Sequence, residues 1–330
     1  MPRPPTGDEV PPAASDEAPL VTVTGPLPEP EAARVLRLAG AAAGRDGVGP
    51  LSEHVVLHLR YGGDAPARNV LLTAGPALAG YGHLDPAEAA DPAEGPAAEL
   101  VIHPDYRGRG LGLLLARTLL AESAPHPLRV WAHGDLPAAE SLAARAGFAR
   151  IRSLWTMRRP LTGPLPAPVF PEGVTVRTFS VGADEAAWLD VNGKAFASHP
   201  EQGAWTAEDL SLREREPWFD PDGFFLAERD GKLVGFHWTK VHGPADNEHP
   251  AAPGHEAIGE VYVVGVDPAG QGGGLGRALT LAGLHYLRSR GLPEVMLYVD
   301  EDNRAAVRLY ESLGFTHEGT DAMFRHPGTS

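Results

Sequence analysis

Short apolar runs alternate with longer amphipathic segments along most of the chain. Runs rich in β-branched residues, such as 70–73, 128–132 and 261–266, predict buried strands. Apolar residues at helical spacing predict helices at 29–43 and 277–290, whereas 51–61 fits either a helix or a strand. Alternating strands and helices of this kind are typical of an α/β (mixed α+β) fold.

One arrangement of strand, glycine-rich loop and helix occurs twice. In the first copy the strand 100–104 leads into the loop 107–112, and in the second copy the strand 261–268 leads into the loop 271–277. The first loop residues are 164 positions apart (271 − 107), about half of the chain. A duplicated domain is the simplest explanation.

Glycines and a helix start give both loops the properties of an anion site. Glycine lets the backbone approach a ligand closely, and the first N–H groups of a helix have no partner inside the helix. These N–H groups and the helix dipole together favour a phosphate. A single loop of this kind also occurs as a plain turn, so it is the duplication that favours a binding function.

The length of 330 residues fits two domains better than one. We expect an N-terminal domain at 19–158 and a C-terminal domain at 173–326, each with a central mixed sheet flanked by helices. The proline-rich segment 159–172 predicts the linker between them. Residues 1–18 contain few large apolar groups, so we expect a disordered tail.

The formal net charge of −15 argues against binding to nucleic acids or to anionic membranes. No stretch resembles a signal peptide or a membrane span, so we expect a cytoplasmic location. The chain has no cysteine, which excludes disulfides, a thiol nucleophile and cysteine-ligated metals. No group of its 14 histidines with an acid stands out at metal-ligand spacing, and we expect no metal.

Two motifs resemble the GNAT acetyltransferase superfamily. The loops Gln-x-x-Gly-x-Gly at 271–276 and Arg-x-x-Gly-x-Gly at 107–112 resemble the acetyl-CoA loop of that superfamily. The segment DNRAAVRLYESLGF at 302–315 resembles its second hallmark, a helix with Asn-x-x-Ala and Tyr-x-x-x-Gly-Phe. The resemblance covers roughly residues 20–326 and implies two tandem GNAT-like domains with acetyl-CoA as co-substrate.

The resemblance also implies which residues hold acetyl-CoA: strand residues near the pantetheine arm, loop residues at the pyrophosphate, and the start of the second-motif helix. In the C-terminal copy these are Val264, Gly265, Val266, Gln271, Gly272, Gly273, Gly274, Leu275, Gly276, Arg277, Asn303, Arg304, Ala305, Ala306, Val307 and Arg308. In the N-terminal copy they are Leu100, Val101, Ile102, Arg107, Gly108, Arg109, Gly110, Leu111 and Gly112.

The two copies differ at two positions that matter for acyl transfer. Glu260 precedes the second glycine loop, and counting residues places Pro96 at the matching position of the first copy. Tyr310 precedes the second Gly-Phe pair, and counting places Ala143 at its match. Transfer from a thioester to an amine needs a base for the ammonium and an acid for the leaving thiolate.

The resemblance implies that Glu260 is this base and Tyr310 this acid in the C-terminal domain. Because the first copy keeps the loop but lacks both groups, we expect it to bind acetyl-CoA without turning it over, or to serve a structural role. In the second case it builds part of the acceptor cleft, with Glu53 reaching into the C-terminal site.

Three segments, 46–53, 199–203 and 259–268, are similar to a tandem branch of the superfamily that makes mycothiol. That branch acetylates the cysteinyl amine of cysteinyl-glucosaminyl-inositol, an amino-thiol glycoside. The resemblance implies substrate contacts at Glu53, Glu201, Lys240, Glu260 and Tyr298. Carboxylates suit the ammonium and hydroxyl groups of such an acceptor, and a lysine suits its oxygens.

Two other functions fit the same motifs. One is another tandem GNAT N-acetyltransferase that acts on a protein N-terminus, an aminoglycoside or a small amine. The other is an acetyl-CoA-binding sensor without transfer. Glu260 and Tyr310 favour an enzyme over a sensor, and only resemblance favours the glycoside over other acceptors. Two fused copies can supply the pairing that single-domain relatives obtain by dimerising, so we expect a monomer.

Overall fold

The computed structural model describes residues 18–63, 66–86, 94–197, 199–243, 257–270 and 272–328. The predicted tail lies outside this part of the chain except for its last residue. The strands are β1 (Leu20–Thr24), β2 (Arg68–Ala74), β3 (Ala77–Asp85), β4 (Ala97–Ile102), β5 (Leu128–Ala132), β6 (Ala149–Pro160), β7 (Val174–Thr178), β8 (Phe224–Arg229), β9 (Lys232–His242), β10 (Ile258–Val266), β11 (Glu294–Asp300) and β12 (Thr316–His326). The helices are α1 (Glu29–Asp46), α2 (Glu53–Tyr61), α3 (Leu111–Ser123), α4 (Pro137–Ala146), α5 (Glu185–Ala195), α6 (Pro200–Gly203), α7 (Ala207–Glu214), α8 (Leu275–Ser289) and α9 (Arg304–Ser312), with 3-10 turns at Pro104–Tyr106, Pro221–Gly223 and Pro268–Gly270.

Within the described residues the strands form one mixed sheet of 12 strands, which confirms the α/β fold predicted from the sequence. Their order is β1-β2-β3-β4-β5-β12-β6-β11-β10-β9-β8-β7. The ambiguous segment 51–61 is the helix α2, which Ser52 caps by accepting a hydrogen bond from the Val55 N–H. Helices α6 and α7 were not predicted from the sequence, although α7 carries a capping box between Thr206 and Asp209.

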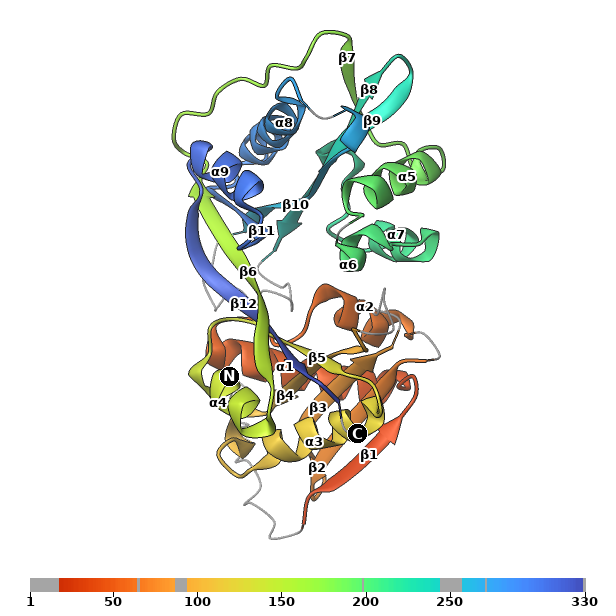
Figure 1. The fold of residues 1–330 in the computed structure, drawn as a ribbon, viewed down its shortest axis with the longest axis vertical. Helices are drawn as coiled ribbons and strands as arrows, with labels where there is room; N and C mark the ends of the chain where they lie inside the picture. Colours follow the sequence, from red (N-terminus) through yellow and green to blue (C-terminus); the bar gives the residue numbers. More distant parts are fainter. Residues whose placement is uncertain are drawn as a thin grey trace, which may run out of the picture.

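Strands β6 and β12 are shared between the two halves of the sheet. Residues 154–160 of β6 pair with β11, which belongs to the C-terminal half. Residues 322–326 of β12 pair with β5, which belongs to the N-terminal half. The two strands also pair with each other, and in Figure 1 they run side by side from one half into the other. Each half therefore completes its sheet with the last strand of the other half.

The parallel strands of each half separate early. Among the described residues, β4 pairs with β5 at three positions, Ala97–Glu99, and β10 pairs with β11 at three positions, Gly259–Val261. A shift of register between Val261 and Val263 adds a bulge to β10. Each half therefore has a gap between its two parallel strands, β4 and β5 or β10 and β11. The gap lies beyond the paired residues, toward the end of β4 or β10 that the glycine loop follows.

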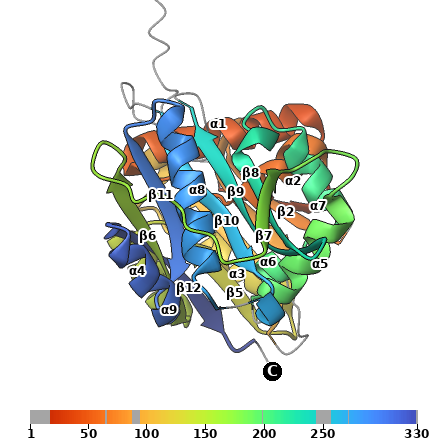
Figure 2. The ribbon, with the colours of Figure 1, turned by 90° about the horizontal axis from the view of Figure 1, so that it is seen from above.

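Helices cover both faces of the C-terminal half. In Figures 1 and 2, α8 and α9 lie on one face of the sheet, and α5, α6 and α7 lie on the other. The second face has an aromatic core in which Trp188, Phe224 and Trp238 are fully buried, with the rings of Phe224 and Trp238 stacked at 4.5 Å. This packing holds β9 and β10 rigidly beside the helices.

The proline-rich connector packs over α8, as Figure 2 shows. The predicted linker 159–172 begins inside β6, which ends at Pro160. Leu161 is buried and its N–H donates to the Pro293 carbonyl at 2.8 Å, while His285 Nε2 lies 2.9 Å from the Pro166 carbonyl.

Among the helices described, none has the length and apolar character that crossing a membrane requires.

Candidate active site

A cavity of about 850 Å³ lies between the two halves. The N-terminal half contributes Ser52, Glu53, His54, His58, Asp85, Glu99 and His133 to its lining. The C-terminal half contributes Arg213, Tyr262, Val264, Tyr298, Asp300, Asn303 and Tyr310. The cavity therefore joins the first residues of α2 to the edge of the gap between β10 and β11.

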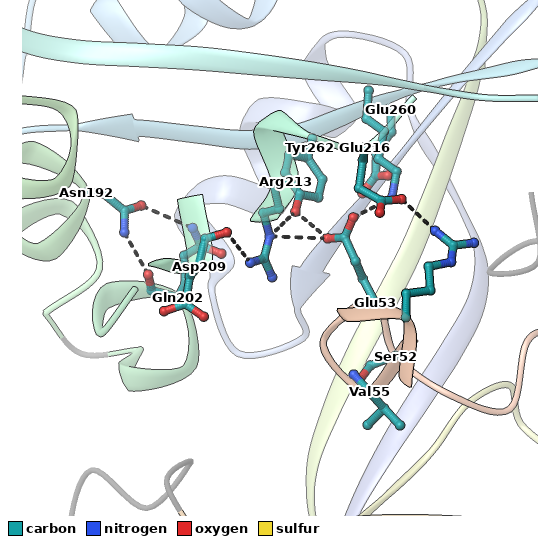
Figure 3. Close-up of polar contacts among 12 residues, drawn as sticks. Ser52, Glu53, Val55, Asn192, Gln202, Asp209, Arg213, Glu216, Glu260 and Tyr262 are labelled. Atoms are coloured by element: carbon teal, nitrogen blue, oxygen red, sulfur yellow. Dashed lines mark hydrogen bonds and ion pairs between the residues drawn. The ribbon is translucent and has the colours of Figure 1, made fainter. Parts of the chain in front are cut away.

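Glu53 crosses this cavity and contacts the C-terminal half. Its Oε1 accepts a hydrogen bond from Lys240 Nζ at 2.8 Å, and its Oε2 accepts one from the Tyr262 hydroxyl. Arg213 Nε lies 3.5 Å from the same Oε2 and donates to the Tyr262 oxygen at 2.8 Å. Figure 3 shows Glu53 pointing from the start of α2 toward Tyr262 and Arg213. The structure thus brings together two of the predicted substrate contacts, Glu53 and Lys240.

Charge pairing decides the protonation of Glu53. Burial raises its pKa, but the nearby charges of Lys240 and Arg213 outweigh burial and lower the pKa to about 2, from the ordinary 4.5. Both cations also face aromatic rings, with the Arg213 guanidinium 3.8 Å from the Trp205 ring and Lys240 Nζ 4.6 Å from the Trp218 ring. Glu53 is therefore ionised at neutral pH.

Glu260 lies directly behind this cluster. It pairs across the sheet with Lys240, and its Oε2 lies 2.6 Å from His242 Nε2. The side chain is buried and is not part of the cavity lining. Any proton exchange between Glu260 and a group in the cavity therefore needs an intermediary such as a water molecule.

Tyr310 and Tyr298 line the cavity at its C-terminal end. Tyr310 comes from α9 and is 7% exposed, and burial raises the pKa of its hydroxyl to about 12. At this pKa the hydroxyl is protonated at neutral pH. Within the described part of the chain no hydrogen bond to this hydroxyl occurs, so it is available to a ligand in the cavity. Glu201 belongs to α6, and its side chain lies outside the described side chains.

Hydrogen bonds to α5 hold the short helix α6 in place. Asn192 of α5 donates to the Gln202 carbonyl at 2.7 Å, and the Gln202 side chain donates back to Asn192 Oδ1 at 3.1 Å, as Figure 3 shows. This pair keeps the segment before α7 at the cavity, where His199 Nδ1 lies 3.5 Å from Asp300 Oδ2.

An ion pair between Arg152 and Asp300 also lines the cavity, and the sequence analysis missed both residues. Arg152 comes from β6 and donates to the two carboxylate oxygens of Asp300, on β11, at 2.5 and 2.9 Å. Arg213 and Tyr262 were missed as well. No local motif marks any of the four, because their contacts join segments that are far apart in sequence.

Both glycine loops have the backbone shape of an anion cradle. Gly110 (φ 81°) and Gly274 (φ 82°) adopt the left-handed conformation at the N-caps of α3 and α8, and neither helix has a side-chain cap. A Cβ added at Gly110, Gly272 or Gly274 would meet nothing within 4 Å. The free helix N–H groups and open space fit the pyrophosphate of acetyl-CoA. Gln271, a predicted cradle residue, lies outside the described residues.

A second cavity, of about 480 Å³, lies at the gap between β4 and β5 in the N-terminal half. Leu100–Ile102 and the loop residues Arg107, Gly108 and Gly110–Gly112 line it, as the sequence predicted for an acetyl-CoA groove. Arg107 forms a two-pronged ion pair with Asp46, with both N–O distances at 2.7 Å. A carboxylate of its own half therefore already balances the charge of this arginine.

Strand pairing gives a better match between the two halves than counting residues does. The bulge between Val261 and Val263 adds one residue to β10, whereas β4 pairs with β3 without a shift of register. When this extra residue is allowed for, counting back from the glycine loop places Ala97, and not Pro96, at the position of Glu260. Ala143 is the true counterpart of Tyr310, since each carbonyl accepts the N–H of the following Gly-Phe phenylalanine. The N-terminal half lacks both groups.

Buried polar contacts tie β12 to the start of α2. His133 Nδ1 lies 3.0 Å from Asp321 Oδ2, its Nε2 lies 3.7 Å from Glu99 Oε1, and Glu99 Oε2 accepts the Ser52 N–H at 2.7 Å. Burial lowers the pKa of His133, but its bonds to Asp321 and Glu99 prevail and raise it to about 10. A charged His133 thus helps to hold the helix that carries Glu53.

One group of side chains in the described residues has the composition of a metal site. His54, His58, His83 and Asp85 each place a ligand atom within 4.8 Å of the others. The sequence analysis missed this group, although His54 and His58 stand four positions apart on α2.

The fold and the two loop sites together define a tandem acetyltransferase of the GNAT type. The model of the acetyltransferase (GNAT) family matches residues 48–148 and 191–315, which is more than half of the chain. The chain belongs to the acetyltransferase (GNAT) family, as the sequence motifs predicted, and acetyl-CoA is the co-substrate that this membership implies.

The chain is similar over most of its length to three known proteins. It is 61% identical over 303 residues to the mycothiol acetyltransferase of Acidothermus cellulolyticus, covering 90% of this chain and 91% of that protein. It is 62% identical over 291 residues to the mycothiol acetyltransferase of Thermobispora bispora, covering 88% and 94%. A tandem GNAT protein from the clavulanic acid biosynthesis pathway has the same fold, with a TM-score of 0.68, 20% identity and coverage of 94% and 100%.

We expect Glu53→Gln to lower the free energy of unfolding at pH 7 by on the order of 2–3 kcal/mol. The pKa of Glu53 in the folded chain, about 2, lies below its ordinary 4.5, so the carboxylate stabilises the fold above pH 4.5. This contribution is lost as the pH falls from 4.5 toward 2, where the protonated carboxyl resembles the amide. Urea unfolding of both proteins from pH 7 downward measures the difference.

Glu122→Gln, on an exposed position of α3, is the matched control for this prediction. It should change the unfolding free energy little at any pH. A difference between wild type and Glu53→Gln that stays constant between pH 7 and pH 3 would contradict the assignment of a strongly lowered pKa to Glu53.

Proposed function

We propose that the chain transfers the acetyl group of acetyl-CoA to the cysteinyl amine of cysteinyl-glucosaminyl-inositol, the last step of mycothiol biosynthesis. The observation that carries the proposal is the 61–62% identity, over about nine tenths of the chain, to proteins named mycothiol acetyltransferase. The division into domains 19–158 and 173–326 and the roles of the site residues belong to the same proposal. A cytoplasmic location and a monomeric state stay predictions.

The position of the gap beside the cavity supports a direct transfer. In this proposal the pantetheine arm of acetyl-CoA lies along Val264–Val266, with its pyrophosphate on the loop before α8 and beside α9. The thioester then faces the cavity near Tyr310, and the acceptor amine approaches from the cavity. An amine held at this place needs no further diffusion to reach the carbonyl carbon.

Glu260 and Tyr310 divide the proton transfers. Glu260 accepts a proton from the acceptor ammonium through water, which frees the nitrogen lone pair to attack the thioester carbonyl. The C–N bond forms, the C–S bond breaks, and the electron pair leaves with sulfur. Tyr310 then gives its proton to the CoA thiolate, and the second proton that the nitrogen loses on becoming an amide restores the Tyr310 hydroxyl. Its high pKa keeps the hydroxyl protonated until that charge develops.

The charged groups of the cavity suit a polyhydroxylated amine. In this proposal Glu53 and Tyr262 form a hydrogen-bonding surface for the sugar and inositol hydroxyls, and Asp300 offers a carboxylate at the other wall. The predicted contact Lys240 is buried and acts on the acceptor through Glu53, to which it donates a hydrogen bond. Because Glu53 comes from the N-terminal half, acceptor recognition needs both halves. Glu201 and Tyr298 remain proposed contacts of the same acceptor.

We further propose that the N-terminal groove binds acetyl-CoA without turning it over. The loop geometry and the second cavity support binding, since both resemble the C-terminal site. In this proposal the N-terminal half has no catalytic pair, since Ala97 and Ala143 stand where the C-terminal half has a carboxylate and a phenol.

The acceptor is tested with a panel of amines. We expect cysteinyl-glucosaminyl-inositol to give a kcat/KM at least about 100-fold above that of glucosamine, an aminoglycoside and a peptide N-terminus, because the buried polar groups of the cavity need its hydroxyls as partners. Release of free CoA is the measurement. Equal rates for all amines would favour a general N-acetyltransferase, and release with none would favour a sensor.

Removal of the acid or the base should slow transfer without preventing binding. We expect Glu260→Gln and Tyr310→Phe each to lower kcat by about 10²–10⁴-fold while the Kd for acetyl-CoA changes little, because general acid–base catalysis contributes this much. Glu228→Gln, on β8 away from the cavity, is the control. An undiminished kcat for Glu260→Gln would remove Glu260 as the base.

Two equivalent glycines separate the roles of the two grooves. Gly110 and Gly274 share the same φ, the same N-cap position and the same open surroundings, so Gly110→Trp and Gly274→Trp strain the backbone equally. We expect each variant to bind one acetyl-CoA fewer than wild type in calorimetry, and Gly274→Trp alone to abolish transfer. Wild-type stoichiometry in Gly110→Trp would mean that the N-terminal groove does not bind.

A further inference from the structure

Four metal-ligating side chains converge from two adjacent elements of the N-terminal half. His54 and His58 lie one turn apart on α2, so they share a face of the helix. His83 and Asp85 lie two positions apart on β3, so they share a face of the strand. The four ligand atoms lie within 4.8 Å of one another, and His54, His58 and Asp85 border the larger cavity.

The contacts within this group show how closely it is packed. His54 Nε2 lies 2.6 Å from Asp85 Oδ2. The rings of His54 and His58 have their centroids 4.1 Å apart, and those of His58 and His83 are 5.5 Å apart. His83 and Asp85 are each 2% exposed. Three imidazoles and one carboxylate therefore lie together at the wall of the larger cavity, with His83 and Asp85 buried and His54 and His58 half-buried.

His83 carries the observation that points to a ligand. The Tyr81 hydroxyl donates to Asn69 Oδ1 at 2.6 Å, so both oxygens can accept from His83 Nδ1, which lies 3.3 and 3.4 Å from them. This network assigns the ring hydrogen to Nδ1 and leaves a lone pair on Nε2. Nε2 is buried and has no hydrogen-bond partner in the described residues. Outer contacts of this kind orient histidines that ligate metals.

We propose that His54, His58, His83 and Asp85 bind one divalent transition metal ion of the zinc type. Three imidazole nitrogens and one carboxylate oxygen form a four-ligand set that suits Zn²⁺, whereas Mg²⁺ and Ca²⁺ require mainly oxygen ligands. Zn–N bonds of about 2.0–2.1 Å place tetrahedral ligand atoms about 3.4 Å apart. Small rotations of the four side chains bring them to that separation.

Metal binding replaces the contact between His54 and Asp85 by two bonds to the ion, and any proton on His54 leaves to solvent. Because four protein ligands fill a tetrahedral site, the ion has a structural role. It fastens α2 to β3 one residue after Glu53, so it steadies the carboxylate that crosses the cavity. The evidence for the metal site does not rest on the proposed acetyl transfer, and the site departs from the expectation that the chain holds no metal.

The test uses the tag-free full chain, first dialysed against a chelator. We expect Co²⁺ to bind with one equivalent and to give the intense visible absorption of tetrahedral coordination, and we expect Zn²⁺ to remove that absorption. Zn²⁺ should also raise the melting temperature. Absence of a tetrahedral Co²⁺ spectrum together with absence of Zn²⁺ binding in calorimetry would overturn the proposal, whatever the acetyltransferase activity.

Single ligand variants locate the site. His54→Ala and His58→Ala, at half-buried positions on α2, should weaken Zn²⁺ binding by about 100-fold or more and keep the circular dichroism spectrum of wild type. His285→Ala, an α8 histidine outside the cluster, should bind Zn²⁺ like wild type. Unchanged Zn²⁺ affinity in His54→Ala and His58→Ala would place the ion elsewhere and overturn the assignment.

Discussion

The exchange of β6 and β12 is the constraint on which the rest of the structure depends. β6 pairs with β11 at seven positions and β12 pairs with β5 at five, so separation of the halves would open two ladders. An unpaired sheet edge is costly, and each half removes its edge with a strand of the other. The exchange therefore sets the distance between α2 and β10, and with it the width of the cavity.

The cost of burying an unpaired charge then determines which side chains can face each other across the cavity. Lys240 is 2% exposed and cannot stay buried as an ion without a partner, and Glu53 supplies it from the opposite half. Arg213 and Tyr262 complete the same set of contacts. The proposed acceptor surface thus contains residues of both halves, which gives the N-terminal half a role in this proposal whether or not its own groove binds acetyl-CoA.

The two halves kept the same scaffold while their chemistry diverged. Both glycine loops begin a helix with a left-handed glycine, and both strand pairs separate after three positions. The backbone sites for an anion and for a pantetheine arm depend on these features alone, so they survive changes of side chain. The proposed acid–base chemistry depends on single side chains, and the first half has Ala97 and Ala143 at the matching positions.

The sequence by itself determined most of the element types, the duplication and the two glycine loops, because helix periodicity, glycine positions and motif spacing are local properties of the chain. It left 51–61 undecided and did not reveal α6 and α7. It also marked Glu260 and Tyr310 by comparison of the copies. Only the tertiary structure decided that β6 and β12 exchange places, that Ala97 matches Glu260, and that His83 meets His54. Glu53 and Lys240 are 187 positions apart, and their contact arises from strand pairing between the halves, which no local pattern specifies.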